Sequence, residues 1–159
     1  MKKFISIITL FFVLIYVLVI SSANAEENKN LKVVSNLDLH KFQGVWYEIA
    51  HNPWFPEKNC FSMIAHYKVS EDSKIEVTNI CRKHGFNGEI SKIVGKAWLV
   101  DQTITSKWEV QFIWPFSLDY WVIDLEENFN YAVIGEPDKD NFWILSRKPI
   151  MEKGLHSKI

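Results

Sequence analysis

The side chains able to do acid, base or nucleophilic chemistry are scattered along this chain. The five histidines lack His-x-x-x-His spacing and the two cysteines lack Cys-x-x-Cys spacing, so no zinc-type ligand set is predicted. The histidines lie at positions 40, 51, 66, 84 and 156. The sequence also lacks the Gly-x-Ser-x-Gly turn that presents a nucleophilic serine. We therefore expect no catalytic residues, no metal and no cofactor.

The first 25 residues have the features of a secretory signal peptide. Lys2 and Lys3 form a short positive region, residues 4–20 are mostly apolar, and Ala23-Asn24-Ala25 supplies a cleavage site. We expect cleavage after Ala25 and export. The alternative is an uncleaved anchor, because an apolar stretch of this length is at the lower limit for crossing a bilayer. No cysteine lies near the cleavage site, so no lipid anchor is expected.

The net charge and the aromatic content indicate which classes of partner the chain could bind. Two of the 18 Lys+Arg and none of the 19 Asp+Glu precede residue 26, so the exported part has a formal charge of −3. That balance carries no electrostatic signature for nucleic acid or for an anionic membrane. The chain holds 7 Trp, 5 Tyr and 11 Phe, which is more than a minimal core requires in a domain of this size. Aromatic side chains fill barrels and also line apolar pockets.

Hydrophobic periodicity predicts an all-β domain. Eight short segments are separated by turn-rich connectors, and the clearest, 107–114, alternates Trp108, Val110 and Phe112 with polar residues. Antiparallel strands joined in sequence close most simply into an eight-stranded up-and-down barrel; a two-sheet sandwich is the alternative. The other expected strands are 44–50, 61–69, 74–82, 90–100, 118–125, 130–135 and 142–147. The domains are then a leader at 26–36, a barrel at 37–149 and a tail at 150–159.

Three motifs in the expected order resemble those of the lipocalins. Gly44-Val45-Trp46 resembles the motif that opens their first strand, Asp119-Tyr120 the second motif, and Arg147 the third. The chain resembles in particular the bacterial lipocalins related to apolipoprotein D, through Gly95-Lys96-Ala97-Trp98, Tyr120-Trp121-Val122-Ile123 and Gly135-Glu136-Pro137-Asp138. The resemblance covers about Leu37 to Pro149. It implies a barrel in which the guanidinium of Arg147 closes one end over the indole of Trp46.

Both cysteines follow the signal, where an oxidising compartment favours one disulfide; two buried free thiols are the alternative. Cys60 opens the second expected strand and Cys81 ends the third, so an antiparallel hairpin would place them opposite each other.

The resemblance implies binding, transport or storage of a small hydrophobic ligand, such as a fatty acid or a lysophospholipid, in the periplasm or as a secreted protein. Association with the outer membrane, peripheral contact with a membrane and a homodimer are further expectations. The alternatives are an envelope interaction or stress protein without a fixed ligand, and, less favoured, an enzyme on this fold. Each proposed ligand residue could instead be ordinary core filling. The candidates are Glu48, Trp54, Phe55, Met63, Ala65, Tyr67, Trp98, Trp108, Val110, Phe112, Tyr120 and Val122.

Two features of the sequence, an acidic residue on the first strand and a short C-terminal segment, differ from what a lipocalin barrel leads us to expect. An inward carboxylate at Glu48 is costly unless it is paired, solvated or used by a polar ligand group, and the sequence does not assign His51 as its partner. Lipocalins also continue beyond the last strand into a helix, which the residues after Arg147 make short or absent. Outward Tyr47 and Ile49 would then form an apolar patch, which predicts lower stability or a dimer.

Overall fold

The protein is described from a computed structural model, which covers residues 31–52, 59–71, 74–138 and 141–151. The expected signal peptide, the candidates Trp54 and Phe55, and the end of the tail lie outside the described residues. None of the helices in the described part has the length and apolar character needed to cross a membrane.

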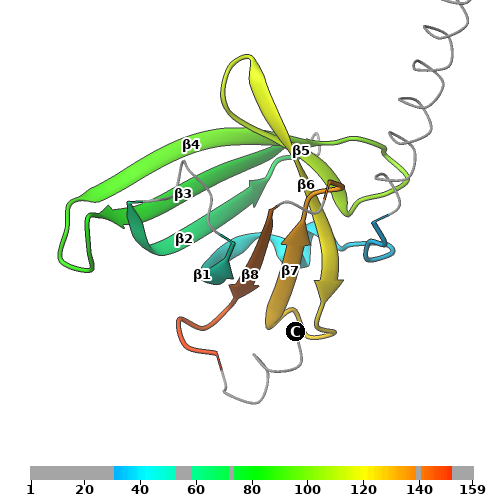
Figure 1. The fold of residues 1–159 in the computed structure, drawn as a ribbon. Coiled ribbons are helices and arrows are strands. Elements are labelled where there is room, and N and C mark those ends of the chain that lie inside the picture. The colour runs from blue at the N-terminus through cyan, green and yellow to red at the C-terminus, as the bar shows by residue number, and fades with distance from the viewer. Residues whose placement is uncertain (1–30, 53–58, 72–73, 139–140, 152–159) are drawn as a thin grey trace, which may run out of the picture. The chain divides into compact units, whose positions relative to one another are not determined.

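Eight antiparallel strands close into a barrel in sequence order, which confirms the predicted fold (Figure 1). Each strand pairs with its neighbours along the chain, and the first pairs with the last. The strands are β1 Gly44–His51, β2 Cys60–Val69, β3 Ile75–Lys83, β4 Ile90–Leu99, β5 Lys107–Ile113, β6 Phe116–Leu125, β7 Tyr131–Gly135 and β8 Phe142–Ser146.

One short helix, α2 (Leu39–Phe42), precedes β1 and was not predicted. The Asp38 side chain begins it by accepting hydrogen bonds from the amides of His40 and Lys41. A single turn leaves almost no 3.6-residue signal in the sequence, which explains the omission. The helix places Phe42, fully buried, inside one end of the barrel.

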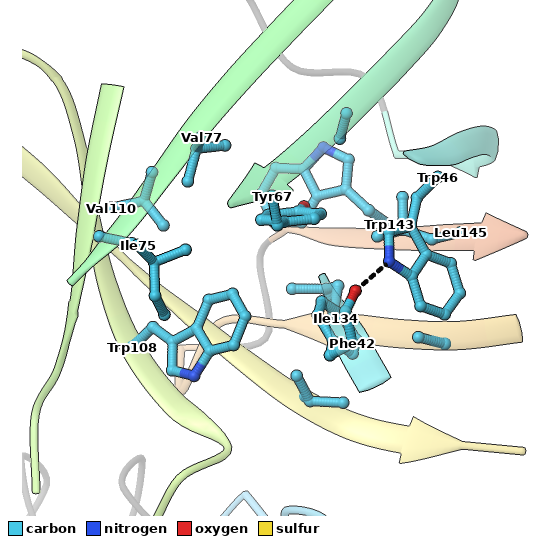
Figure 2. Packing of buried hydrophobic residues seen from close by; sticks show 14 of the residues in the cluster. Phe42, Trp46, Tyr67, Ile75, Val77, Trp108, Val110, Ile134, Trp143 and Leu145 are labelled. Atoms are coloured by element: carbon cyan, nitrogen blue, oxygen red, sulfur yellow. Dashed lines mark hydrogen bonds between the residues drawn. The ribbon is translucent and has the colours of Figure 1, made fainter. Parts of the chain in front are cut away.

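Aromatic rings fill that end, which we call the closed end (Figure 2). The Phe42 ring lies 4.9 Å from Trp46 and 5.3 Å from Trp108, measured between centroids. Tyr67 packs edge-on against Trp108 and shares a 2.5 Å hydroxyl–hydroxyl hydrogen bond with Tyr120. Part of the aromatic surplus is therefore core and not pocket.

Arg147 closes the barrel as the motifs implied. Its guanidinium carbon lies 3.8 Å from the Trp46 ring centroid, and its nitrogens donate to the carbonyls of residues 41, 42, 43 and 45. Trp46 Nε1 donates to the Phe42 carbonyl at 2.7 Å (Figure 2). Gly44 has a φ of +97°, and a Cβ there would lie 3.4 Å from an Arg147 nitrogen. The glycine thus gives the positive φ and the space that the arginine needs.

The structure differs from two predictions about the outside of the barrel, one on the leader segment and one on an apolar patch. The Val34 amide, in the segment assigned to the leader, donates a hydrogen bond to the Val122 carbonyl of β6, and the Val34 carbonyl accepts one from the Ser106 hydroxyl, so this part of the leader packs on the barrel. Tyr47 and Ile49 are half-buried, so the expected exposed patch is not found there. The homodimer, which rested on that patch, stays an untested prediction.

Candidate ligand cavity

A cavity of about 350 Å³ opens at the end of the barrel opposite α2, which we call the open end. This size falls within the range of small-molecule sites in proteins. Its wall combines the ends of β2, β3 and β4 with the β5–β6 hairpin. The lining residues are Cys60, Met63, Asn79, Cys81, Lys83, Ser91, Ile93, Val110, Phe112, Ile113, Phe116, Ser117 and Leu118.

A second, smaller space of about 40 Å³ lies deeper in the barrel. Met63, Val110, Phe112, Leu118 and Asn79 line both spaces, so the two are adjoining parts of one interior. The deeper wall also includes Glu48, Ala65, Tyr67, Val77, Tyr120, Trp143 and Leu145. The interior therefore narrows from an open mouth to an aromatic floor.

Most of the proposed ligand residues line these spaces. Glu48, Met63, Ala65, Tyr67, Val110, Phe112 and Tyr120 do so. Gly95 helps to place Phe112, because a Cβ at that position would come within 2.6 Å of the Phe112 ring.

Three of the other candidates, Trp98, Trp108 and Val122, do not line these spaces. Trp98 follows buried Ala97 on β4 and shares its face with Lys96, whose Nζ lies 5.8 Å from the Trp98 ring centroid. It therefore lies on the outer face, because alternation along the strand puts Ala97 inside. Trp108 and Val122 point inward but are buried in the closed-end core, below the cavity.

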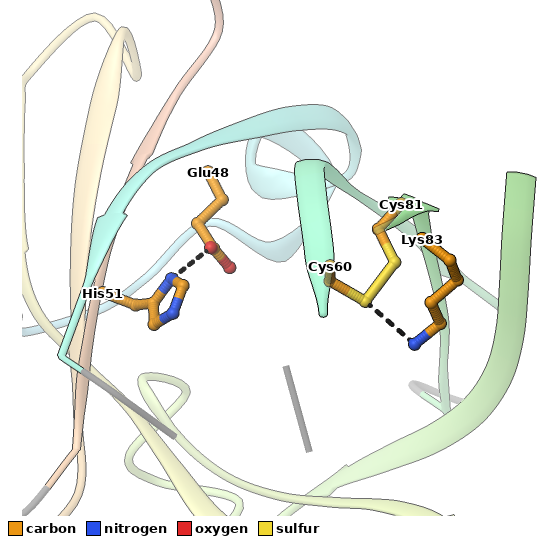
Figure 3. The surroundings of a disulfide bond; sticks show 5 residues. All are labelled: Glu48, His51, Cys60, Cys81 and Lys83. Carbon is orange, nitrogen blue, oxygen red and sulfur yellow. Dashed lines mark hydrogen bonds and ion pairs between the residues drawn. A yellow bond between two sulfur atoms is a disulfide. The ribbon is translucent and has the colours of Figure 1, made fainter. Parts of the chain in front are cut away.

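Glu48 has a partner that the sequence did not assign. His51 Nδ1 and Glu48 Oε1 are 2.6 Å apart, with the glutamate side chain 9% exposed and the histidine 27% (Figure 3). Residues three apart on a regular strand face opposite sides. Here the pairing with β8 shifts between Glu48 and Ala50, so the extra residue returns His51 to the inner face. The buried carboxylate is thereby satisfied at the edge of the cavity.

The disulfide between Cys60 and Cys81 is present and forms part of the cavity wall (Figure 3). The cysteines are not directly opposite, because the register places Cys60 against Lys83 and Cys81 against Ser91. A bulge between Phe61 and Ile64 causes this offset, and the bridge runs diagonally.

Two polar wall residues were missed by sequence reasoning. Lys83 Nζ lies 3.3 Å from Cys60 Sγ, and within the described residues no carboxylate oxygen comes within 4.0 Å of it. The Asn79 side-chain oxygen is buried and accepts no hydrogen bond from the part of the chain that is described. The two-residue alternation along β3 places both with Cys81 and could have identified them once Cys81 was taken as inward.

The groups with displaced pKa values lie away from the cavity, at the closed end. Hydrogen bonds from Thr103 lower the pKa of Asp101, and hydrogen bonds from Asn130 and Asn128 lower that of Glu126. Burial lowers the pKa of Arg147. Across the described ranges, no cluster of three or more His, Cys, Asp or Glu side chains could hold a metal ion. The wall of the cavity is mostly apolar and includes one cationic side chain, that of Lys83, so the cavity can enclose an apolar molecule and offer it a positive charge.

A family model for a lipocalin-like domain matches residues 37–159. The chain belongs to the lipocalin family. Lipocalins bind small hydrophobic molecules. The alternative of a two-sheet sandwich is excluded.

Relatives of this lipocalin include bacterial and animal proteins. It is 33% identical to the outer membrane lipoprotein Blc of Vibrio cholerae, over 82% of this chain and 76% of that protein. It is 32% identical to bovine (Bos taurus) apolipoprotein D, over 75% of this chain and 65% of the relative. Insecticyanin of the tobacco hornworm Manduca sexta superposes with a TM-score of 0.65 at 27% identity, covering 81% of this chain and 73% of the other. These matches confirm the resemblance drawn from the motifs.

Proposed function

We propose that this lipocalin binds and carries a single-chain lipid with an anionic head group, its acyl chain in the barrel and its head at the mouth. A fatty acid and a lysophospholipid both fit this description. The observation that carries the proposal is an apolar cavity whose wall contains one amine, Lys83, without a carboxylate partner among the described residues.

Energetics are compatible with this assignment. Each buried methylene contributes about 0.8 kcal/mol, so a long chain supplies about 10 kcal/mol before the costs of association. Those costs amount to several kcal/mol, which leaves an expected dissociation constant in the micromolar range. The head group adds discrimination, since a charge-assisted hydrogen bond contributes about 1.5–3 kcal/mol.

Asn79 supports a polar head group as well. Its buried oxygen accepts no hydrogen bond within the described residues, and it lines both parts of the interior. A lipid hydroxyl or a water molecule could donate to it. Other polar side chains of the wall already have partners: Glu48 pairs with His51, Tyr67 with Tyr120, and the Ser117 hydroxyl donates to Glu109.

Export to the cell envelope, in the periplasm or beyond, is part of the same proposal. The relative from Vibrio cholerae is named an outer membrane lipoprotein, which supports an envelope location. The signal-peptide features of residues 1–25 support export independently. A binding role without catalysis is favoured because the family consists of binding proteins.

The test is a titration followed by tryptophan fluorescence. Three lipids with the same acyl chain carry a carboxylate, a phosphodiester or an uncharged glycerol head, each kept below its critical micelle concentration. We expect all three to bind and the two anionic lipids to bind more tightly. Lys83→Met should reduce that preference by about tenfold, whereas Lys83→Arg should retain most of it.

Equal affinity for the three head groups in wild type and Lys83→Met would remove the head-group assignment. Absence of binding by all three would remove the lipid carrier itself. Native mass spectrometry and lipid extraction of protein from its own source would then decide whether any ligand is held, or whether the protein acts through surface interactions alone.

A further inference from the structure

The open end carries large apolar side chains that are exposed to solvent. Phe86 and Ile90 on the β3–β4 hairpin are 71% and 67% exposed. Ile113, Trp114 and Phe116 on the β5–β6 hairpin are 65%, 81% and 75% exposed. We call these five residues the mouth rim. Single exposed apolar residues are ordinary, but a group of this size at one end of a domain marks an interaction site.

The rim is continuous with the cavity. Ile113 and Phe116 belong to the exposed group and also line the 350 Å³ space. An apolar molecule leaving the cavity would therefore pass from its wall onto the rim without crossing a polar belt at the β5–β6 hairpin. In Figure 1 the β3–β4 hairpin extends to the left of the view and the β5–β6 hairpin rises at the top.

Charge near the rim differs from charge in the whole exported chain. The segment 82–92, which contains the β3–β4 hairpin, has the cations Arg82, Lys83 and Lys92 and the single acid Glu89. Arg82 Nη1 donates to the Gly88 carbonyl at 3.2 Å, which fixes one positive charge near the tip. The β5–β6 tip, residues 113–117, has no charged residue. A local positive charge thus borders an apolar tip in a chain whose average charge is negative.

We propose that the mouth rim docks this lipocalin on the surface of an anionic lipid bilayer, so that the cavity opens toward the membrane. This docking rests on the proposed function, because a lipid carrier must contact the membrane that supplies or receives its ligand. Tryptophan and phenylalanine at an exposed tip suit the membrane–water interface, where one side of a ring is apolar and the other is hydrated. Arg82 and Lys92 of this segment would contact anionic head groups.

A bilayer fits this surface better than a second protein molecule does. The rim residues come from two separate hairpins, β3–β4 and β5–β6. A bilayer accepts such separate apolar tips individually, whereas a stable protein interface needs a continuous complementary surface. The basic segment also matches anionic lipid without requiring a partner of defined shape.

The test uses protein purified after export, with its N-terminus read by mass spectrometry. Sedimentation with vesicles of phosphatidylethanolamine and phosphatidylglycerol compares wild type with the double variant Trp114→Ser/Ile90→Ser. Neither position lines the cavity. The matched control is Val45→Ser/Val100→Ser, two exposed apolar residues at the closed end. We expect the rim variant to lose more than about tenfold in vesicle affinity and the control to change less than about twofold.

A site-specific readout keeps the result independent of the N-terminal segment. Trp114→Cys and Val100→Cys, each labelled with an environment-sensitive fluorophore while the native disulfide stays closed, report insertion at the two ends. The label at 114 should shift to the blue on anionic vesicles, and less so with purely zwitterionic vesicles or high salt. The label at 100 should not shift.

Three outcomes would overturn docking: equal vesicle binding by both double variants, no shift of the label at 114, or equal shifts at both positions. A dimer in solution that only the rim variant dissociates would assign the rim to a second copy instead. Binding of monomeric lipid in solution is measured separately on Trp114→Ser/Ile90→Ser. Failure of the carrier proposal would appear there, whereas failure of docking would appear only with vesicles.

Discussion

Glu48 and His51 are three positions apart on β1 and still face the same side of the sheet, where their side chains are 2.6 Å apart. The bulge at Ile49 allows this contact, because one extra residue reverses the alternation of inward and outward side chains along the strand. It also turns Ala50 away from the interior, since Ala50 pairs with Ile144 and not with an inward residue of β8. A local change of register therefore decides which side chain pairs with the Glu48 carboxylate.

The Glu48–His51 pair should contribute to stability as a unit. We expect His51→Ala to lower the free energy of unfolding by about 1–3 kcal/mol, because the buried carboxylate loses its imidazole partner. Glu48→Gln combined with His51→Ala should cost less than the sum of the single changes. Urea denaturation of the four proteins measures the coupling, with exposed His40→Ala as the control. Additivity within about 0.5 kcal/mol would show that the pair is not coupled.

The contact between Trp46 and Arg147 should contribute strongly to the stability of the barrel. Trp46→Ala removes a fully buried ring and is expected to cost about 3–5 kcal/mol. Trp46→Phe keeps an aromatic face but loses the hydrogen bond to the Phe42 carbonyl, so its loss should be smaller. Thermal unfolding compares these variants with Lys148→Ala, an exposed neighbour of the arginine. An unchanged midpoint for Trp46→Ala would contradict the assignment.

The disulfide should stabilise the barrel mainly by restricting the unfolded chain. Cys60 and Cys81 are 21 positions apart, and a loop of that length is worth about 3 kcal/mol in the chain-entropy estimate. Replacement of both cysteines by serine should therefore lower stability by about this amount while the fold is kept. Denaturation of wild type with and without a reductant provides the comparison. The double variant should be insensitive to the reductant.

The lowered pKa of Glu126 should make the stability of the folded protein depend on pH in the acid range. Hydrogen bonds from Asn130 and Asn128 lower its pKa in the folded protein below the value in the unfolded chain. The unfolded state therefore takes up the proton first as the pH falls, and stability is lost down to the folded pKa. Glu126→Gln should reduce the decrease in the urea midpoint between about pH 5 and pH 3. Glu127→Gln, at its exposed neighbour, should leave that decrease unchanged.

Two tryptophans distinguish the inside of the barrel from the outside. Trp143 is 5% exposed and lines the deeper space, whereas Trp98 lies on the outer face. A bound lipid should quench fluorescence strongly in Trp98→Phe and weakly in Trp143→Phe. The two titrations use the same lipid and protein concentration. The reverse result would return Trp98 to the ligand site and contradict the orientation of β4.

The sequence by itself determined the barrel. Alternation along 107–114 and the turn-rich connectors predicted strands that agree with the structure to within one or two residues. Turn residues and a period of two are local properties, so they survive in a single sequence. The glycine, tryptophan and arginine motifs likewise predicted which residues close the barrel.

Tertiary structure decided which inward residues meet a cavity and which are core. Trp108 and Phe112 lie on the same inner face of β5, but only Phe112 borders the space, because α2 and Phe42 fill the end nearer Trp108. Trp98 was misplaced because its face depends on the register of β4 against β5. Lys83 lines the cavity from β3, whereas His51 reaches Glu48 through a bulge that no local sequence pattern predicts. Periodicity is set by neighbours along the chain, whereas depth in the barrel and register are set by strands far apart in sequence.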